Sequence, residues 1–139
     1  MSIIVIGLSL SFLLFLLAAG LTLIFGMLGV INFAHGALYM LGAFVGYQIV
    51  HMTGSFWLGL LFAPLIVACV GALIEILALK QVYDRDHIFQ LLLTFGFILV
   101  IDDATKMIWG FDYKQVPTPE IFMAPISMFG SQIPSYRLF

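Results

Sequence analysis

The polar side chains best placed to bind a solute are Asn32 and His35, in the middle of the apolar run 20–47. Hydrocarbon offers no water, so polar side chains and interrupted backbone at membrane depth need protein or a cavity around them. Interrupted transmembrane segments are typical of places where a solute binds or passes. We therefore interpret Asn32 and His35 as candidates for a translocation path. The alternative has equal weight: Asn32 as the N-cap of the next helix and His35 as a structural hydrogen-bonding residue.

A second set of candidates consists of charged side chains at the ends of later apolar runs. Glu75 is the first charged residue of the chain and lies little more than one helical turn before Lys80. We expect Glu75 to reach the aqueous interface as a structural residue; pairing with a basic group of the loop or of another subunit is the alternative. Asp102, Asp103 and Lys106 could carry ions or protons. The spacing of Asp102 and Lys106 favours a solvated, partly self-paired helix end instead.

The sequence contains no catalytic constellation. It has no Ser-His-Asp order, no pair of carboxylates suited to a soluble cleft, no glycine-rich phosphate loop and no metal motif. Cys69 is the only cysteine, which excludes an internal disulfide, and no Cys/His cluster has zinc spacing. We therefore expect a protein that is not an enzyme and that holds no cofactor or metal. The formal net charge of −2 gives no indication of nucleic-acid binding.

Composition indicates that membrane helices position these candidates. The chain is 63% hydrophobic and 9% charged, and no Asp, Glu, Lys or Arg precedes Glu75. Uncharged apolar runs longer than about 18 residues favour transmembrane helices over a soluble core. We predict an all-α, polytopic integral membrane protein with about four transmembrane helices, broken near Gly26–Gly36. The expected helices cover residues 3–31, 34–50, 56–79 and 88–109; the first lacks the basic start of a signal peptide and should be retained.

Glycines occur where helices are expected to loosen or to pack closely. Gly42 and Gly46 form a GxxxG pair, which allows a neighbouring helix to approach. Gly71 shares a face of small residues with Ala68 and Ala72 on the following helix. We interpret six glycines as packing or conformational devices rather than ligand contacts: Gly26, Gly29, Gly36, Gly42, Gly46 and Gly71.

Two polar segments connect or follow the helices. The clearest hydrophilic loop is Lys80–His87, reading KQVYDRDH, and its two basic residues place it in the cytoplasm by the positive-inside rule. Residues 111–135 are expected to form a long loop after a helix that ends at Gly110. Its proline density excludes a continuous helix, since prolines occur at Pro117, Pro119, Pro125 and Pro134.

Two blocks of the sequence resemble permease subunits of branched-chain amino-acid ABC importers. The first is GLTLIFGMLGVINFAHGALYMLGAFVGY, with INFAHG as its most specific part. The second is IEILALKQVYDRDHIFQLLLTFGFILVIDDATKMIWG, in which an acidic residue ends a helix, a loop contains R-D, and L-L-x-T-x-G follows. The residues at the matching positions of the second block are Glu75, Arg85, Asp86, Thr94 and Gly96.

The resemblance implies a permease that forms a heterodimer with a second related permease in the cell inner (plasma) membrane. Two cytoplasmic ATPase subunits would drive it, and an extracytoplasmic substrate-binding protein would deliver leucine, isoleucine, valine or a related small amide. Members of this family are longer, and in them a segment like IPSYRLF leads into a further helix. By this resemblance residues 1–139 form the N-terminal transmembrane part of a permease domain, with no second domain. The resemblance thus predicts a truncated permease that does not transport alone.

Two other functions remain open from the residues. In the first, the chain is an ion- or proton-conducting membrane subunit in which Glu75, Asp102 and Asp103 carry protons. In the second, it is a membrane fragment that binds a partner but moves nothing. Uptake that requires ATP hydrolysis and a binding protein would favour the permease, whereas uptake that collapses with the proton gradient would favour the conductor.

Overall fold

The computed structural model describes residues 2–119, 121, 125–128 and 131–134. Its helices are α1 (Ser2–Leu28), α2 (His35–Thr53), α3 (Phe56–Leu77) and α4 (His87–Trp109), with a short 3₁₀ helix η1 (Leu79–Val82) between α3 and α4. Two strands follow, β1 (Pro125–Met128) and β2 (Ser131–Pro134). The chain divides into two units, residues 21–116 and residues 1–20 with 117–139. Each unit is described by itself.

The helices confirm the prediction of an all-α, polytopic membrane protein that is interrupted between residues 28 and 35. Among the described residues, three segments are long and apolar enough to cross a membrane: Ile3–Met27, Phe56–Val82 and His87–Trp109. The remaining α-helix, α2, has 19 residues and is less apolar than these three segments. Its polar and aromatic side chains at positions 35, 39, 47, 48 and 51 account for that lower hydropathy. α2 packs against both α3 and α4 within the unit 21–116.

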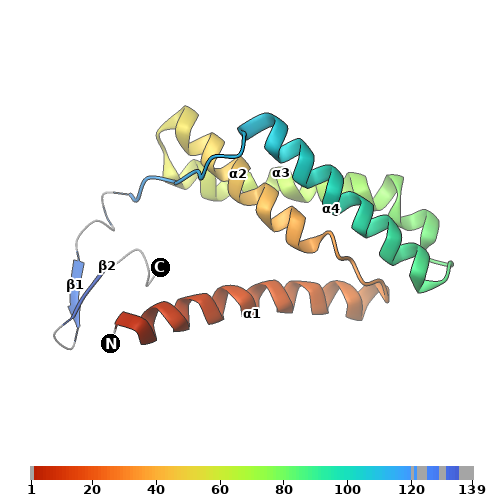
Figure 1. Ribbon diagram of the computed structural model, residues 1–139, viewed down its shortest axis with the longest axis horizontal. Coiled ribbons are helices and arrows are strands. Elements are labelled where there is room, and N and C mark those ends of the chain that lie inside the picture. Colours follow the sequence, from red (N-terminus) through yellow and green to blue (C-terminus); the bar gives the residue numbers. More distant parts are fainter. Residues whose placement is uncertain (1, 120, 122–124, 129–130, 135–139) are drawn as a thin grey trace. The chain divides into compact units, whose positions relative to one another are not determined.

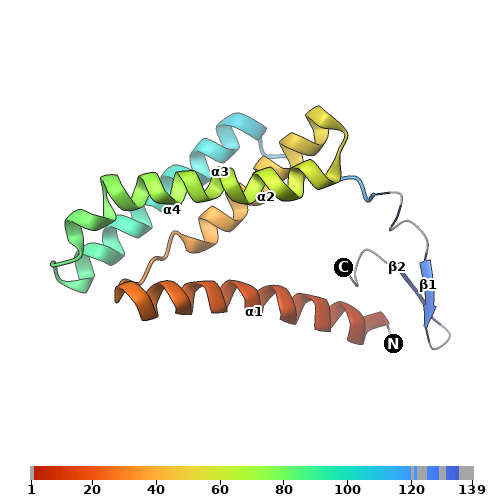
Figure 2. The same ribbon diagram turned by 180° about the vertical axis from the view of Figure 1, so that it is seen from behind.

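α2 and α3 run in opposite directions and meet along a close seam (Figures 1 and 2). A β-carbon built on Gly42 would lie 3.4 Å from Val67 Cγ2, one on Gly46 would lie 3.6 Å from Ala63 Cβ, and one on Gly71 would lie 3.9 Å from Leu38 Cδ1. The contacts therefore repeat every four residues, with residue numbers that rise along α2 and fall along α3. Small residues on both helices allow this approach, as small-xxx-small interfaces do in membranes.

α4 packs against α2 through a face that is mostly polar. Its buried residues are Gln90, Thr94, Ile101 and Thr105, spaced so that they share one side of the helix. At the C-terminal end of α4, Trp109 Nε1 donates to Gln48 Oε1 over 3.0 Å, and the Trp109 ring lies 5.6 Å from the Phe44 ring. These two contacts fix the end of α4 to α2.

The segment after α4 differs from the expected loop. Gly110 ends the helix with φ 79°, and its N–H donates to Lys106 O over 2.8 Å, as predicted for a glycine stop. Further on, β1 and β2 pair as an antiparallel hairpin in which Pro125 lies opposite Pro134. Proline lacks a backbone donor, so it is tolerated at the ends of a two-stranded ribbon. The prediction of a loop was therefore wrong for these eight positions, and the segment 135–139 lies outside the described part.

Candidate functional site: the connection between α1 and α2

The interruption predicted from the sequence is the six-residue connection 29–34. Gly29 closes α1 with φ 66°, and its N–H donates to Phe25 O over 2.8 Å. A residue with a side chain is strained at this φ, which explains why glycine stands here. The connection that follows is partly buried: Val30 is 2% exposed and Ala34 is fully buried, whereas Phe33 is 50% exposed.

Asn32 organises the turn that precedes α2. Its side chain is 8% exposed, and its Oδ1 accepts from the Ala34 N–H over 3.0 Å. Its backbone carbonyl accepts from the His35 N–H over 3.2 Å, and the first helical bond runs from Leu38 N–H to Ala34 O. The N-cap of α2 is therefore Ala34, not Asn32 as one interpretation proposed. Asn32 instead forms an Asx turn, in which its side-chain oxygen accepts from the backbone N–H two residues later, before the helix begins.

His35 and Glu75 both lie at one end of the α2–α3 seam. His35 is the first residue of α2 and Glu75 lies in the last turn of α3, and both are half-buried. Within the described part of the chain, neither side chain makes a hydrogen bond or an ion pair. The alternative interpretation, a pairing of Glu75 with a basic group of the loop, is thus not seen among those residues. A role in the translocation path for Asn32 or His35 stays a prediction.

The loop between α3 and α4 is held by Gln90, a residue that the sequence analysis missed. Gln90 is 3% exposed, and its Nε2 lies 3.1 Å from Val82 O, 3.3 Å from Tyr83 O and 3.5 Å from Arg85 O. His87 Nδ1 lies 3.2 Å from Gln90 Oε1. One buried amide thus satisfies several carbonyls of the turn that the hydrophilic motif forms. Its only sequence signal was a glutamine among apolar residues at the start of a membrane-length helix.

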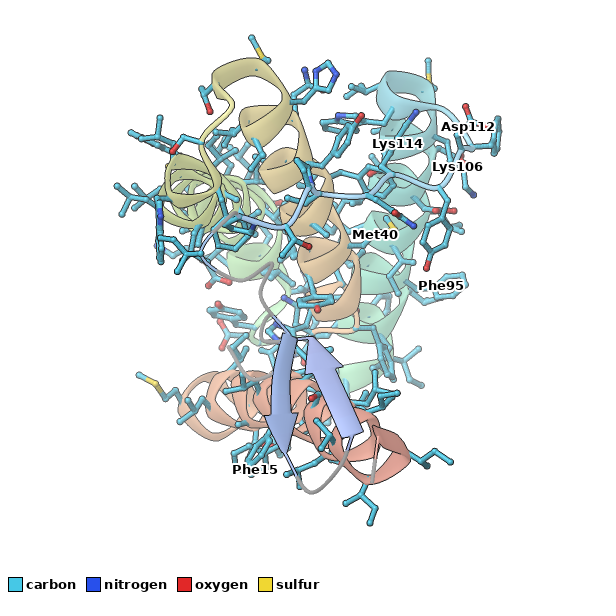
Figure 3. The ribbon with its side chains drawn as sticks, turned by 90° about the vertical axis from the view of Figure 1, so that its left-hand side faces the viewer. Phe15, Met40, Phe95, Lys106, Asp112 and Lys114 are labelled. Carbon is cyan, nitrogen blue, oxygen red and sulfur yellow. The ribbon has the colours of Figure 1, made fainter. Side chains whose placement is uncertain are left out.

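The charged residues near the end of α4 are partly paired with one another. Lys106 Nζ forms an ion pair with Asp102 Oδ2, as the spacing of four predicts, while Asp103 is exposed. Lys114 Nζ lies 3.9 Å from Asp112 Oδ2 in the following segment. Figure 3 shows Lys106, Asp112 and Lys114 together at this end of α4, whereas Phe95 points away from α2. This group favours the interpretation as a solvated helix end.

The six glycines of the prediction fall into two groups. Gly42, Gly46 and Gly71 lie along the α2–α3 seam, at the distances given above. A β-carbon on any of the other three would have no described atom within 4 Å, so a packing role for them stays a prediction: Gly26, Gly29 and Gly36. The tightest position was missed. A β-carbon on Gly59 would lie 2.6 Å from Val50 Cγ2 and 3.2 Å from Gly46 O.

Two of the predicted site residues, Asn32 and His35, lie at the interruption between α1 and α2. The connection 29–34 presents a buried amide, and a half-buried imidazole follows it at the start of α2. Across the described residues, no three His, Cys, Asp or Glu side chains gather closely enough to hold a metal ion.

Comparison with known proteins identifies relatives over most of the chain. The profile of the family "Branched-chain amino acid transport system / permease component" matches residues 3–135. The high-affinity branched-chain amino acid transport system permease protein LivH of Salmonella typhimurium is 30% identical over 116 residues, as is LivH of Escherichia coli K12; each match covers 77% of this chain. The corresponding permease protein BraD of Pseudomonas aeruginosa is 26% identical over 114 residues, which cover 74% of this chain.

These relatives are longer than the chain. The matched region spans 37% of each LivH protein and 36% of BraD. No solved structure matches the chain. The family match over residues 3–135 thus includes the connection 29–34, α2, α3, α4 and all but the first residue of α1.

Proposed function

Because this chain belongs to the family of permease components of branched-chain amino acid transport systems, we propose that it forms the N-terminal transmembrane part of a permease for branched-chain amino acids or related small amides. It is a multi-pass protein of the cell membrane, and its family consists of transport permeases rather than enzymes. The match of the family profile to residues 3–135 is the observation that carries the proposal.

The proposed mechanism is alternating access, in which the connection 29–34 and the start of α2 line part of the path. A solute that crosses a membrane must exchange water for protein groups, and polar side chains in an otherwise apolar chain are the groups available. Asn32 and His35 supply such groups at one end of the seam. The aliphatic side chain of a branched-chain amino acid needs only apolar contacts, so a dense polar site is not required.

The proposed assembly contains subunits beyond this chain. They are a second related permease, two cytoplasmic ATPase subunits that supply the energy, and an extracytoplasmic substrate-binding protein that delivers the solute. The names of LivH and BraD describe those relatives as high-affinity permease proteins, which supports a system of this kind. In this proposal the loop containing η1 faces the cytoplasm, in accord with its two basic residues.

Uptake of labelled L-leucine into cells tests the proposal. Deleting the gene for this chain should lower high-affinity leucine uptake, and restoring it should recover the rate. Unlabelled isoleucine and valine should compete, and urea or acetamide would compete instead if the substrate is an amide. Leucine, valine and amide uptake that all stay unchanged after deletion would contradict the proposal.

A single substitution then tests the proposed path. His35→Ala removes the imidazole at the start of α2, so it should reduce the uptake rate while the protein still reaches the membrane and assembles. Immunoblotting and co-purification with partner subunits check assembly. Unchanged uptake kinetics at normal expression would remove His35 from the path.

A further inference from the structure

The register of the α2–α3 seam relates Glu75 to the start of α2. The seam contacts pair Val50 with Gly59 at one end and Leu38 with Gly71 at the other. Glu75 lies four residues beyond Gly71, and four residues before Leu38 is Ala34, the residue adjacent to His35. Because the two helices run in opposite directions, one more step of the same register brings Glu75 level with Ala34, the residue before His35.

The groups at this end of the seam have unused hydrogen-bonding capacity. Within the described residues, the Glu75 carboxylate has no ion pair and the His35 imidazole has no hydrogen bond. The Asn32 amide uses its oxygen for the Ala34 N–H, and its NH₂ group makes no further bond to a described residue. One side of the seam therefore offers a negative group, and the other offers donors.

His35 and Glu75 do not pair with each other. They form no ion pair within 4.0 Å, although both are half-buried and the register places Glu75 beside the start of α2. A half-buried carboxylate at the end of a membrane-length helix is costly without a partner. An α-amino acid carries the complementary pair of charges: an ammonium for the carboxylate, and a carboxylate for the imidazole and amide donors.

We propose that Glu75, with His35 and Asn32 opposite it, binds the zwitterionic head group of an α-amino acid. Glu75 takes the ammonium, and the Asn32 NH₂ and the His35 ring take the carboxylate. This inference rests on the proposed function and adds the polar contacts that distinguish an amino acid from a neutral amide. The apolar side chain of the solute would contact the surrounding aliphatic residues, which supply no charge of their own.

Cysteine labelling tests this site without relying on transport. Replacing the single cysteine by Cys69→Ser leaves a background in which Gly36→Cys is the one reporter thiol, next to His35 and with no described atom within 4 Å of its β-carbon. Maleimide labelling is measured in native membranes that contain the full chain and its partner subunits. L-Leucine should slow labelling of the reporter several-fold, while 4-methylpentanoate, which lacks the ammonium, should not.

Glu75→Gln should abolish the protection by L-leucine, and Asp84→Asn, a change at an exposed loop carboxylate, should preserve it. A thiol introduced by Thr53→Cys at the other end of α2 should label at one rate with or without leucine. Equal protection by leucine and 4-methylpentanoate, or protection that survives Glu75→Gln, would overturn the inference. If leucine gives no protection in cells whose leucine uptake depends on this chain, the inference is also overturned. Equal protection of both reporter thiols by leucine would overturn it as well.

A direct contact between Glu75 and His35 is the competing explanation. A disulfide between His35→Cys and Glu75→Cys in the Cys69→Ser background reports how close the two positions come. The proposal predicts that leucine slows formation of this disulfide. Fast formation that leucine does not change would show a closed structural contact and overturn the site, whereas the deletion experiment on uptake tests the proposed function separately.

Discussion

At the scale of single residues, several hydroxyl side chains in the helices bond to a carbonyl of their own helix. Ser11 Oγ donates to Gly7 O over 2.8 Å, Thr94 Oγ1 to Gln90 O over 2.9 Å and Thr105 Oγ1 to Ile101 O over 2.6 Å. Such bonds let hydroxyl residues sit in apolar helices at little cost. Asn32 and Gln90 are different, because each satisfies backbone groups of a turn outside a helix.

Asn32→Ala should destabilise the connection between α1 and α2. The substitution leaves the buried Ala34 N–H without its acceptor, which costs about 1–3 kcal/mol. Reversible unfolding in detergent micelles measures the loss. Asn32→Ser keeps an acceptor oxygen on a short side chain and should recover part of the stability, and an Ala variant as stable as the parent chain would contradict the role of this turn.

Gln90→Leu should loosen the loop between α3 and α4 while leaving the helices formed. Leucine has nearly the same volume but no donor for the carbonyls of Val82 and Tyr83. Hydrogen exchange of residues 79–87 should speed up, by an amount that corresponds to about 1–3 kcal/mol of lost protection. Gln81→Leu is the matched control, since Gln81 is exposed and bonds only to its own helical turn at Leu77 O. Equal effects of the two substitutions would show that Gln90 does not hold the loop.

The sequence shows which residues of the connection are polar, but it does not determine which hydrogen bonds they make. Asn32 stood out because an amide is rare inside an apolar run, yet whether it caps the helix or forms the preceding turn depends on backbone angles that composition does not set. Gln90 escaped notice because its partners lie five to eight residues earlier, in a loop whose path is set by tertiary structure. Local sequence thus located the site and left its bonding open.

At the scale of elements, the seam between α2 and α3 is the tightest contact of the unit 21–116. Its small residues alternate between the two helices, with Gly42 and Gly46 on one and Gly59 and Ala63 on the other. Membrane helices gain little from apolar burial, so close backbone approach and van der Waals contact carry much of their association. A β-carbon at the tightest position has no room without a shift of one helix.

Gly59→Ala should therefore weaken this seam. Its new methyl group would lie 2.6 Å from Val50 Cγ2 and 3.2 Å from the backbone oxygen of Gly46. Overpacking of this kind costs about 1–3 kcal/mol, and the gain in helix propensity of up to about 1 kcal/mol offsets only part of it. Unfolding in detergent measures the change. Gly96→Ala, where a β-carbon meets no described atom within 4 Å, should be neutral or slightly stabilising. If Gly96→Ala lowered the free energy of unfolding more than Gly59→Ala, the close packing at Gly59 would be contradicted.

Element boundaries were predicted well where hydrophobicity alone decides them. The expected helix 88–109 begins one residue earlier in the structure, at His87, and ends at Trp109 as predicted. The GxxxG pair indicated a close helix contact, and Gly71 of its partner face on α3 was predicted. Gly59 and Ala63 of that face were missed because they stand among large apolar residues. The hairpin was missed because proline density excludes helices without excluding a short two-stranded ribbon.

At the scale of the whole molecule, the described part of the chain consists mainly of four α-helices with very few charged residues. One polar connection interrupts them between α1 and α2. Charged groups occur in the loop after α3 and near the end of α4, which are the places where helices of this length meet water. The region matched in the LivH proteins is 37% of their length, so the account assigns this chain a part of a larger path rather than a complete one. Family membership and the interrupted helices together lead to the proposed import function.

Energy coupling of leucine uptake tests that account most directly. Uptake of labelled L-leucine is measured in cells with and without the gene for this chain, under a protonophore with ATP maintained and under ATP depletion with the proton gradient maintained. The account predicts that the part of uptake that depends on this chain survives the protonophore and is lost on ATP depletion. Chain-dependent uptake that persists without ATP and collapses with the proton gradient would contradict it.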